Sequence, residues 1–488
     1  MRRSACFFIY KTAVLWYDAN RKRWFSRRKG RISMGRELLK YHISPRIVRA
    51  DAVQTITVKG LDGSSRFYDD CEYFAEVFPL EEYDFVKDRS FPSGNPGREI
   101  ACRCENGTVS FDYFFMGEQE WSIRIYRKET VKHRNPMYDH HGKAWQHLID
   151  RPLNGVKFAV YSLKEDLYER RPLKGDLHIH SDYTDGDESV EMTAALYREA
   201  GYDFIGITDH HSFVPAQKAV EAFRGIPTAF KVYPGEEVHN GYGGYFHTVN
   251  FGCKESVCRR VMEEREQVER EVDELEATID VPEGLDRREM AWRTWIYRSI
   301  KASGGICILP HPYAVIGGVY NIQTKVCKAV FEQGLCDAFE VLGGLKDHAR
   351  NRRQAALYVE TLANGIDLPI VGSNDTHHPM LGHSYNTFDH VFTIAFAKDA
   401  GSVQEAVLNR YSVAVDNNVT DSKTVYGRQR LVNYAWFLLE NYYDAHDKLC
   451  ADIGHALLRH VFGEADQTKL IVLLEDELKK YNRSFFGA

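Results

Sequence analysis

Apolar and polar residues alternate along several short runs between residues 50 and 163, which is the pattern of strands with one buried face. The run from Val109 to Tyr113 shows this alternation, and turn signals such as residues 92–97 separate one run from the next. The pattern predicts an all-β domain over residues 34–165, and we expect it to be sandwich-like.

After Gly175 the pattern changes to short apolar bursts separated by stretches long enough for a crossover helix. Strands joined in this way predict βα units and a parallel sheet or barrel. One connection is too short for a helix, because only residues 238–244 separate the third and fourth bursts, so we expect a hairpin or irregular loop there. The predicted strands are residues 177–180, 204–207, 231–233, 245–249, 306–309, 338–341 and 369–371.

Two further regions have helical spacing. Apolar residues recur every three to seven positions over residues 254–279, within an otherwise charged surface, and predict an amphipathic helix in a helical insert over residues 254–300. We interpret its charges as a solvated face. Residues 399–488 are predicted to form a C-terminal helical region without a recognisable chemical motif.

The composition is that of a globular chain, because 44% of its 488 residues are hydrophobic and 27% are charged. No apolar run approaches the roughly 18 residues of a membrane span, so no membrane partner is expected. The net charge of −6 is unevenly distributed: residues 1–33 hold ten Lys or Arg and one acid, which leaves an acidic body. This acidity argues against extended nucleic acid as a partner.

The basic lead over residues 1–33 is expected to be a disordered arm, or not native if the protein begins at Met34. Lys11 interrupts its apolar stretch, which argues against a signal peptide. The ten cysteines contain no CxxC pair and are expected to be reduced, in a cytoplasmic protein. The sequence leaves the oligomeric state open.

Histidine is concentrated in one part of the chain, with 12 of 20 histidines between residues 178 and 390. Nearly every predicted strand from residue 177 to 371 contains or precedes a His, Asp or Glu, at the end where α/β barrels gather their active sites. A His-x-His on a strand also directs both imidazoles to the same side. These positions predict a buried site for several metal ions.

At these positions the chain, from about residue 174 to 395, resembles the PHP (polymerase and histidinol phosphatase) domain. The resemblance implies a distorted (β/α)7 TIM-like barrel, here over residues 166–398, that binds two to three divalent ions such as Zn, Mn or Fe. All nine ligand types are present: His178, His180 and Asp185 in DLHIHSDYTDG, His210 in ITDHH, Glu237 in PGEEVH, His247 in YFHTVNFG, His311 in LPHP, and Asp375 and His377 in GSNDTHH.

The resemblance also implies how the ions are shared. One ion would be bound by His178, His180, Glu237 and Asp375, a second by Glu237, His247 and His311, and a third by Asp185, His210 and His377. Two choices stay open, because Glu236 could replace Glu237, and each paired histidine (His210/His211 and His377/His378) could be the ligand.

Three divalent ions carry more positive charge than three carboxylates can neutralise, which favours an anionic substrate. The predicted function is therefore a metal-dependent phosphoesterase that cleaves a small phosphorylated metabolite or nucleotide with a metal-bound hydroxide. His211, His239 and His378 could donate a proton, or could be supporting or surface histidines. Arg350, Arg352 and Arg353 could clamp phosphate, or could belong to a solvated helix face.

Two other functions remain open. Some PHP relatives with an N-terminal β domain resemble hydrolases of carbamates or amides, so a carbamate, amide or ester hydrolase is one alternative. A non-catalytic scaffold held together by metal ions is the other. A polymerase-associated role would need a polymerase on the same chain, and no segment is large enough to be one.

Overall fold

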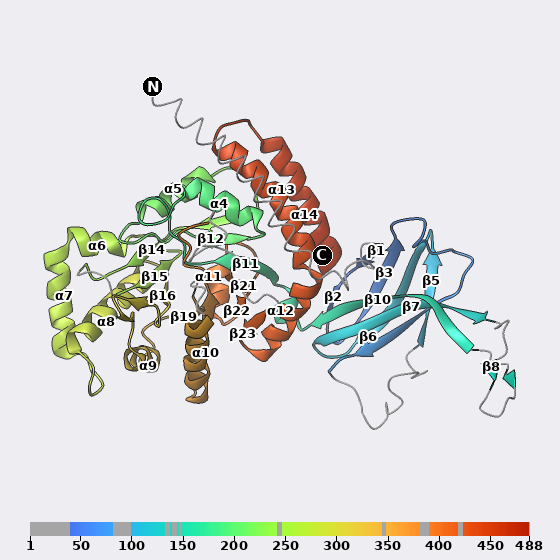
Figure 1. The fold of residues 1–488 in the computed structure, drawn as a ribbon, viewed down its shortest axis with the longest axis horizontal. Coiled ribbons are helices and arrows are strands. Elements are labelled where there is room, and N and C mark those ends of the chain that lie inside the picture. Colours follow the sequence, from blue (N-terminus) through green and yellow to red (C-terminus); the bar gives the residue numbers. More distant parts are fainter. Residues whose placement is uncertain are drawn as a thin grey trace. The chain divides into compact units, whose positions relative to one another are not determined.

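The computed structural model describes residues 40–81, 99–131, 137–138, 144–145, 149–241, 246–343, 348–379, 390–417 and 423–487. The predicted basic lead lies outside these residues. The chain divides into two compact units (Figure 1). The first comprises Met1–Arg46, Asp51–Met116 and Glu120–Val160, and the second comprises Ile47–Ala50, Gly117–Gln119 and Tyr161–Ala488.

The described part of the first unit consists of strands and turns. Seven strands follow one another in the sheet order β1-β3-β6-β5-β4-β7-β10, and β8 pairs with β9. The bounds are β1 (Tyr41–Ser44), β3 (Ala52–Gly60), β4 (Tyr73–Pro79), β5 (Glu99–Glu105), β6 (Thr108–Phe115), β7 (Gln119–Val131), β8 (Met137–Tyr138), β9 (Ala144–Trp145) and β10 (Ile149–Leu163).

Strands β6 and β7 follow each other in the chain but are separated by two strands in the sheet. Strand β5 makes this possible, because its first half pairs with β4 and its second half pairs with β6. Across the two parts, the rings of Phe115 and Trp121 pack edge to face with centroids 5.4 Å apart. The alternating residues Val109 and Phe111 are buried as the sequence pattern requires. The sandwich-like architecture stays a prediction.

The second unit is mixed α/β and contains two main sheets. One has the order β13-β12-β11-β21-β22-β23, and the other has the order β14-β15-β16-β19-β20. Their bounds are β11 (Arg171–Asp176), β12 (Phe204–Gly206), β13 (Lys231–Tyr233), β14 (Gly235–Val238), β15 (Thr248–Phe251), β16 (Ile306–Leu309), β19 (Ala338–Leu342), β20 (Ile370–Gly372), β21 (Val391–Ala397), β22 (Ser412–Asp416) and β23 (Thr424–Tyr426).

The strands pair in two sheets of mixed direction, and the (β/α)7 barrel stays a prediction. The pairs β11–β12, β12–β13, β16–β19 and β19–β20 are parallel, whereas β21 pairs antiparallel with β11, and β15 pairs antiparallel with β14 and β16. The β14–β15 pair is the hairpin expected around residues 238–244. Buried side chains from both sheets, among them Leu177, Phe204, Phe251 and Ile308, form one core cluster.

Two other expectations differ from the structure. Residues 177–180 lie just beyond β11 and are not part of it, although Ile179 makes an isolated parallel bridge to Thr376. Strands β22 and β23 fall within residues 399–488, which were predicted as helical. The short run of β-branched residues Val413 and Val415 forms β22, because antiparallel pairing with β21 extends the sheet there.

Helices surround these sheets (Figure 1). Those between strands are α3 (Glu165–Tyr168), α4 (Val190–Glu199), α5 (Val214–Ala222), α6 (Val257–Glu263), α7 (Arg265–Thr278), α8 (Arg287–Ala302), α9 (Thr324–Glu332), α10 (His348–Ala363) and α11 (Val403–Leu408). Helices α6 to α8 occupy the predicted insert, and its apolar stripe, including Val261, Val268 and Val272, is buried. The small strands β2 (Ile47–Arg49), β17 (Val315–Ile316) and β18 (Val319–Tyr320) complete the unit.

The chain ends in α12 (Gln429–Asn441), α13 (Tyr443–Val461) and α14 (Thr468–Phe486). Helix α13 packs on α4, where a Cβ added at Gly454 would lie 2.4 Å from the Glu199 backbone. Buried charges join these helices to the rest of the unit, since Asp203 accepts from Arg198 at 2.9 Å and lies 3.1 Å from His446. No described helix is long and apolar enough to cross a membrane. All described cysteines are free.

Candidate metal centre

The segment that carries His178 and His180 is held in an extended conformation by hydrogen bonds on both sides. The Ile179 amide donates to Thr208 Oγ1 at 2.9 Å, and the His180 amide donates to the Thr376 carbonyl at 2.9 Å. Because side chains alternate along extended backbone, both imidazoles lie on the face opposite the buried Ile179 side chain. Both imidazoles are fully buried.

Two imidazole nitrogens and two carboxylate oxygens from three different segments lie close together. His178 Nε2 lies 3.5 Å from Glu237 Oε2 and 3.3 Å from Asp375 Oδ1, and His180 Nε2 lies 3.5 Å and 3.0 Å from the same two oxygens. Ligands bound tetrahedrally at about 2.0–2.1 Å lie roughly 3.3 Å apart, so this spacing fits a metal ion. The two imidazole nitrogens and Glu237 Oε2 are buried without a hydrogen-bond partner of good geometry among the described residues.

The second oxygen of Glu237 faces a different pair of histidines. His247 Nδ1 lies 2.6 Å and His311 Nε2 lies 3.5 Å from Glu237 Oε1. Glu237 thus directs one carboxylate oxygen towards each of two donor groups, which is the geometry that a bridging carboxylate needs. Its position is fixed by β14, whose register with β15 pairs Glu237 with Val249.

A third group of donors lies at the open side of the cluster. His210 Nε2 and His377 Nε2 lie 3.4 Å and 3.2 Å from Asp185 Oδ2. The Asp185 side chain is 53% exposed, whereas those of His210 and His377 are 19% and 12% exposed. The structure therefore brings all nine predicted ligands together, with solvent access on the Asp185 side.

The protonation of this cluster follows its charges. Burial alone lowers the pKa of His178, but Asp375 and Glu237 raise it well above its ordinary value. For the same reasons the pKa of His210 rises to about 10, mainly through Glu237, and that of His377 rises to about 9, mainly through Asp375. The imidazoles in turn hold the pKa of Glu237 well below its usual range, against the effect of burial. Cations bound here would replace these protons as partners of the buried carboxylates.

The structure places Glu236 outside the cluster. Its carboxylate accepts hydrogen bonds from the Ser256 hydroxyl at 2.6 Å, from the Val257 amide at 2.6 Å and from Asn250 Nδ2 at 3.0 Å. These contacts stabilise the beginning of α6, where unpaired amides attract negative charge. Of the two glutamates, Glu237 is the one that lies among the predicted ligands.

In each pair of adjacent histidines, His210/His211 and His377/His378, only one member lies at Asp185. His211 is exposed, and its backbone φ is 55°. Its ring centroid lies 4.1 Å from that of His239. His378 Nδ1 lies 2.6 Å from Asp187 Oδ2. In both pairs the first member, His210 or His377, lies at Asp185. A role of His211 or His378 as proton donor stays a prediction.

Glu340 is a buried neighbour of the site that the sequence interpretation missed. Its Oε2 lies 3.0 Å from His178 Nδ1, and its Oε1 accepts from the His311 amide at 3.2 Å. A carboxylate at Nδ1 leaves the Nε2 lone pair of the imidazole for a metal. The sequence contained a signal for this residue, because Glu340 is the one charged residue in the apolar run 338–342.

A second set of buried groups holds the backbone around Asp375. Asn374 Nδ2 donates to Asp176 Oδ2 and to the Val391 carbonyl, each at 2.7 Å, and Asn374 Oδ1 accepts from the Val391 amide at 3.0 Å. Asp375 and His311 both have positive φ angles, 50° and 22°. Non-glycine residues adopt this conformation when their surroundings determine it, and it recurs at functional sites.

The three arginines predicted to clamp phosphate lie on α10. Arg353 contacts the Tyr320 hydroxyl, with its guanidinium 5.6 Å from the centre of that ring. Arg352 is exposed, and Arg350 is half-buried. Their role in phosphate binding stays a prediction.

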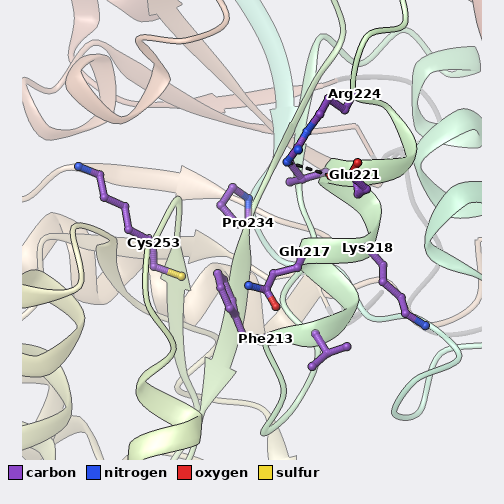
Figure 2. A pocket seen from close by; sticks show the side chains of 10 residues that line it. Phe213, Gln217, Lys218, Glu221, Arg224, Pro234 and Cys253 are labelled. Atoms are coloured by element: carbon purple, nitrogen blue, oxygen red, sulfur yellow. Dashed lines mark ion pairs between the residues drawn. The ribbon is translucent and has the colours of Figure 1, made fainter.

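A surface pocket lies along α5 and is lined by residues that include Phe213, Gln217, Lys218 and Pro234 (Figure 2). Arg224 and Glu221 form an ion pair at 2.9 Å at its edge. None of the nine predicted ligands lines this pocket.

No family model matches the chain. Among curated proteins, the chain is 34% identical over 71 residues to the DNA polymerase/3'-5' exonuclease PolX of Bacillus subtilis (strain 168). That match covers 14% of the chain and 12% of the polymerase.

Solved structures similar to the chain include a two-domain protein containing a predicted PHP-like metal-dependent phosphoesterase from Bacteroides vulgatus ATCC 8482 (17% identity, TM-score 0.38, 56% of this chain and 70% of that chain). Another is a putative metal-dependent phosphoesterase from Bifidobacterium adolescentis ATCC 15703 (17%, TM-score 0.33, 48% and 95%). A third is an amidohydrolase from Chromobacterium violaceum with bound sulfate (20%, TM-score 0.28, 42% and 88%). The resemblance to the PHP family that the ligand motifs indicate is thus met again in the structure comparison, where one of the three proteins is described as PHP-like.

Proposed function

We propose that this protein is a metal-dependent phosphoesterase with three divalent ions in the cluster around Glu237. The observation that carries the proposal is the geometry of the donors. The set His178, His180, Glu237 and Asp375 has donor spacings of 3.0–3.5 Å, and Glu237 turns its other oxygen to His247 and His311. Asp185, His210 and His377 supply the third set.

The donor types favour ions such as Zn, Mn or Fe, because neutral imidazoles bind these ions without cancelling their charge. Bound there, the ions would activate water and neutralise charge on the substrate. Three divalent ions bound by only three carboxylates and six neutral imidazoles leave a surplus of positive charge. This surplus supports an anionic substrate such as a phosphate monoester. The exposed side of Asp185 is where such a substrate would enter.

The residues of the chain have distinct parts in this proposal. Glu237 holds two donor sets together, and Glu340 keeps His178 in the tautomer whose Nε2 lone pair faces Glu237 and Asp375. The buried walls formed by His178, His180 and Glu237 exclude bulk water from one side of the cluster. These groups therefore orient the metal-binding atoms before the substrate arrives. They leave the Asp185 side of the cluster open for the exchange of substrate and product.

The test is hydrolysis by protein loaded separately with Zn²⁺, Mn²⁺ or Fe²⁺, with metal content measured in the same samples. We expect release of phosphate from 4-nitrophenyl phosphate and from a panel of phosphorylated metabolites. Asp375→Asn should lose metal and at least ~100-fold in rate, whereas Asp280→Asn, a change of an exposed aspartate, should lose neither. Faster hydrolysis of a 4-nitrophenyl carbamate or ester than of the phosphate would contradict the phosphoesterase proposal.

Full metal content without turnover of any ester, amide or phosphate would instead favour a scaffold held by metal ions. In that case Asp375→Asn should lower the melting temperature of the loaded protein without any activity to lose.

A further inference from the structure

His239 lies within the donor cluster although it is not one of the nine predicted ligands. It follows β14 directly, two residues after Glu237, and is only 5% exposed. Its Nε2 lies 2.9 Å from His210 Nδ1, and its ring centroid lies 4.5 Å from that of His247. One donor atom from each of His210, Glu237, His239 and His247 lies within 4.8 Å of the other three.

Two other metal-binding atoms lie beside His239 Nε2. His210 Nδ1 is 2.7 Å from Glu237 Oε2 and 2.9 Å from His239 Nε2, so two nitrogens and a carboxylate oxygen converge. His239 therefore directs Nε2 towards the donor cluster, whereas its Nδ1 is buried without a hydrogen-bond partner among the described residues.

A cation bound to Glu237 and His247 would lie within reach of His239, because donor atoms of all three residues lie within 4.8 Å of one another. Ligand atoms around a tetrahedral ion lie roughly 3.3 Å apart, a spacing that this limit accommodates.

We infer that His239 is a tenth metal ligand, which binds the same ion as Glu237 and His247. The inference rests on the metal centre of the proposed function and deepens it, because it names the ion's chemistry. An ion held by a carboxylate and two or more imidazoles is a borderline one, such as Zn²⁺, Fe²⁺ or Co²⁺, in preference to Mg²⁺.

The competing interpretation is that His239 only supports His210 from outside the ligand shell. The two interpretations differ in what removal of His239 does. Loss of a supporting residue costs about 10–100-fold in metal affinity and leaves the coordination number unchanged. Loss of a ligand removes one nitrogen from the ion, which alters its spectrum as well as its affinity.

The experiment compares wild type, His239→Ala and His239→Gln, with His42→Ala as the control. His42 is an exposed histidine on β1, in the first unit. Each protein is stripped, titrated with Zn²⁺ alone and with Co²⁺ alone, and followed by elemental analysis and by visible absorption of the Co²⁺ form. Circular dichroism establishes that each variant is folded, and the Gln variant preserves most of the side-chain volume.

We expect both His239 variants to retain about one Zn²⁺ fewer per chain after dialysis, with affinity at that site reduced by more than ~100-fold. The Co²⁺ absorption bands of that site should disappear or shift, and His42→Ala should match wild type in stoichiometry and spectrum. Wild-type stoichiometry with an unchanged Co²⁺ spectrum in both His239 variants would overturn the inference. These readouts do not use turnover, so a wild-type protein that binds its ions but cleaves no phosphate ester would overturn only the proposed function.

Discussion

Replacement of Glu340 by Gln tests whether a buried carboxylate prepares His178 for metal. In the wild type, Oε2 accepts from His178 Nδ1 and Oε1 accepts from the His311 amide. A Gln side chain has one acceptor and one donor, so it cannot satisfy both. If its oxygen faces the His311 amide, its NH₂ group donates to Nδ1 and moves the His178 proton to Nε2, the atom that faces Asp375 and Glu237. If the Gln amide group is reversed, its NH₂ group faces the His311 N–H, so two hydrogen-bond donors face each other.

In either arrangement the charge-assisted hydrogen bond from His178 Nδ1 to the carboxylate is lost, which costs about 1.5–3 kcal/mol. Because each 1.4 kcal/mol corresponds to a factor of ten, the Zn²⁺ dissociation constant at the His178 site should rise about 10–150-fold. Competition with a chromophoric chelator measures this constant at pH 7. The matched control is Glu332→Gln, which changes an exposed glutamate on α9 and should leave the constant unchanged. If Glu340→Gln binds Zn²⁺ as tightly as wild type, the proposed role of Glu340 at Nδ1 is wrong.

Three further predictions follow from the same cluster and from the helices behind it. Glu237→Gln should release ions from two donor sets in elemental analysis, whereas Glu236→Gln should keep them and lose about 1–3 kcal/mol in urea unfolding, because Glu236 caps α6; equal metal loss in both variants would contradict the assignment of Glu237. Zn²⁺ binding should release protons and tighten as pH rises from 6 to 8, because the metal-free pKa values of His210 and His377 are raised to about 10 and 9; calorimetry in buffers of different ionisation heats measures this, and a pH-independent affinity would refute it. Burial lowers the pKa of His446 but Cys450 and Asp203 raise it well above its ordinary value, so its stabilising charge is fully present below its unfolded pKa of about 6.5 and is lost as pH rises through the folded pKa; His446→Gln should therefore destabilise more at pH 6 than at pH 9 in urea unfolding, and the reverse order would contradict this.

The donor cluster was accessible from sequence because each ligand follows or lies on an apolar burst. The polar residues at the ends of such bursts predicted a site for several metal ions, and the resemblance to the PHP domain implied which nine residues are its ligands. Glu237 could not be distinguished from Glu236 in this way, since the two are adjacent and of the same type. The choice depends on the register of β14 against β15 and on the amides of α6, which attract Glu236.

The strand pattern was less informative about direction. A buried antiparallel strand and a buried parallel strand both read as a short apolar run, so the antiparallel pairing of β15 with β16 was not predicted. Glu340 was missed, and His239 was not counted among the ligands, for a related reason. A polar residue beside a ligand motif has the same appearance whether it contacts the ligands or faces solvent, and only the packing of distant segments distinguishes the two.

The backbone around Asp375 and His311 has a consequence for how the protein acquires its metal. Asn374, Asp176 and the Val391 backbone hold the segment around Asp375 by hydrogen bonds that involve no ion, and the His311 amide donates to Glu340. A segment held in this way keeps its backbone conformation without bound ions, so ions can be exchanged without refolding. The metal found in the purified protein is then set by donor chemistry and by the supply of ions in the cell, so it can differ with the growth medium.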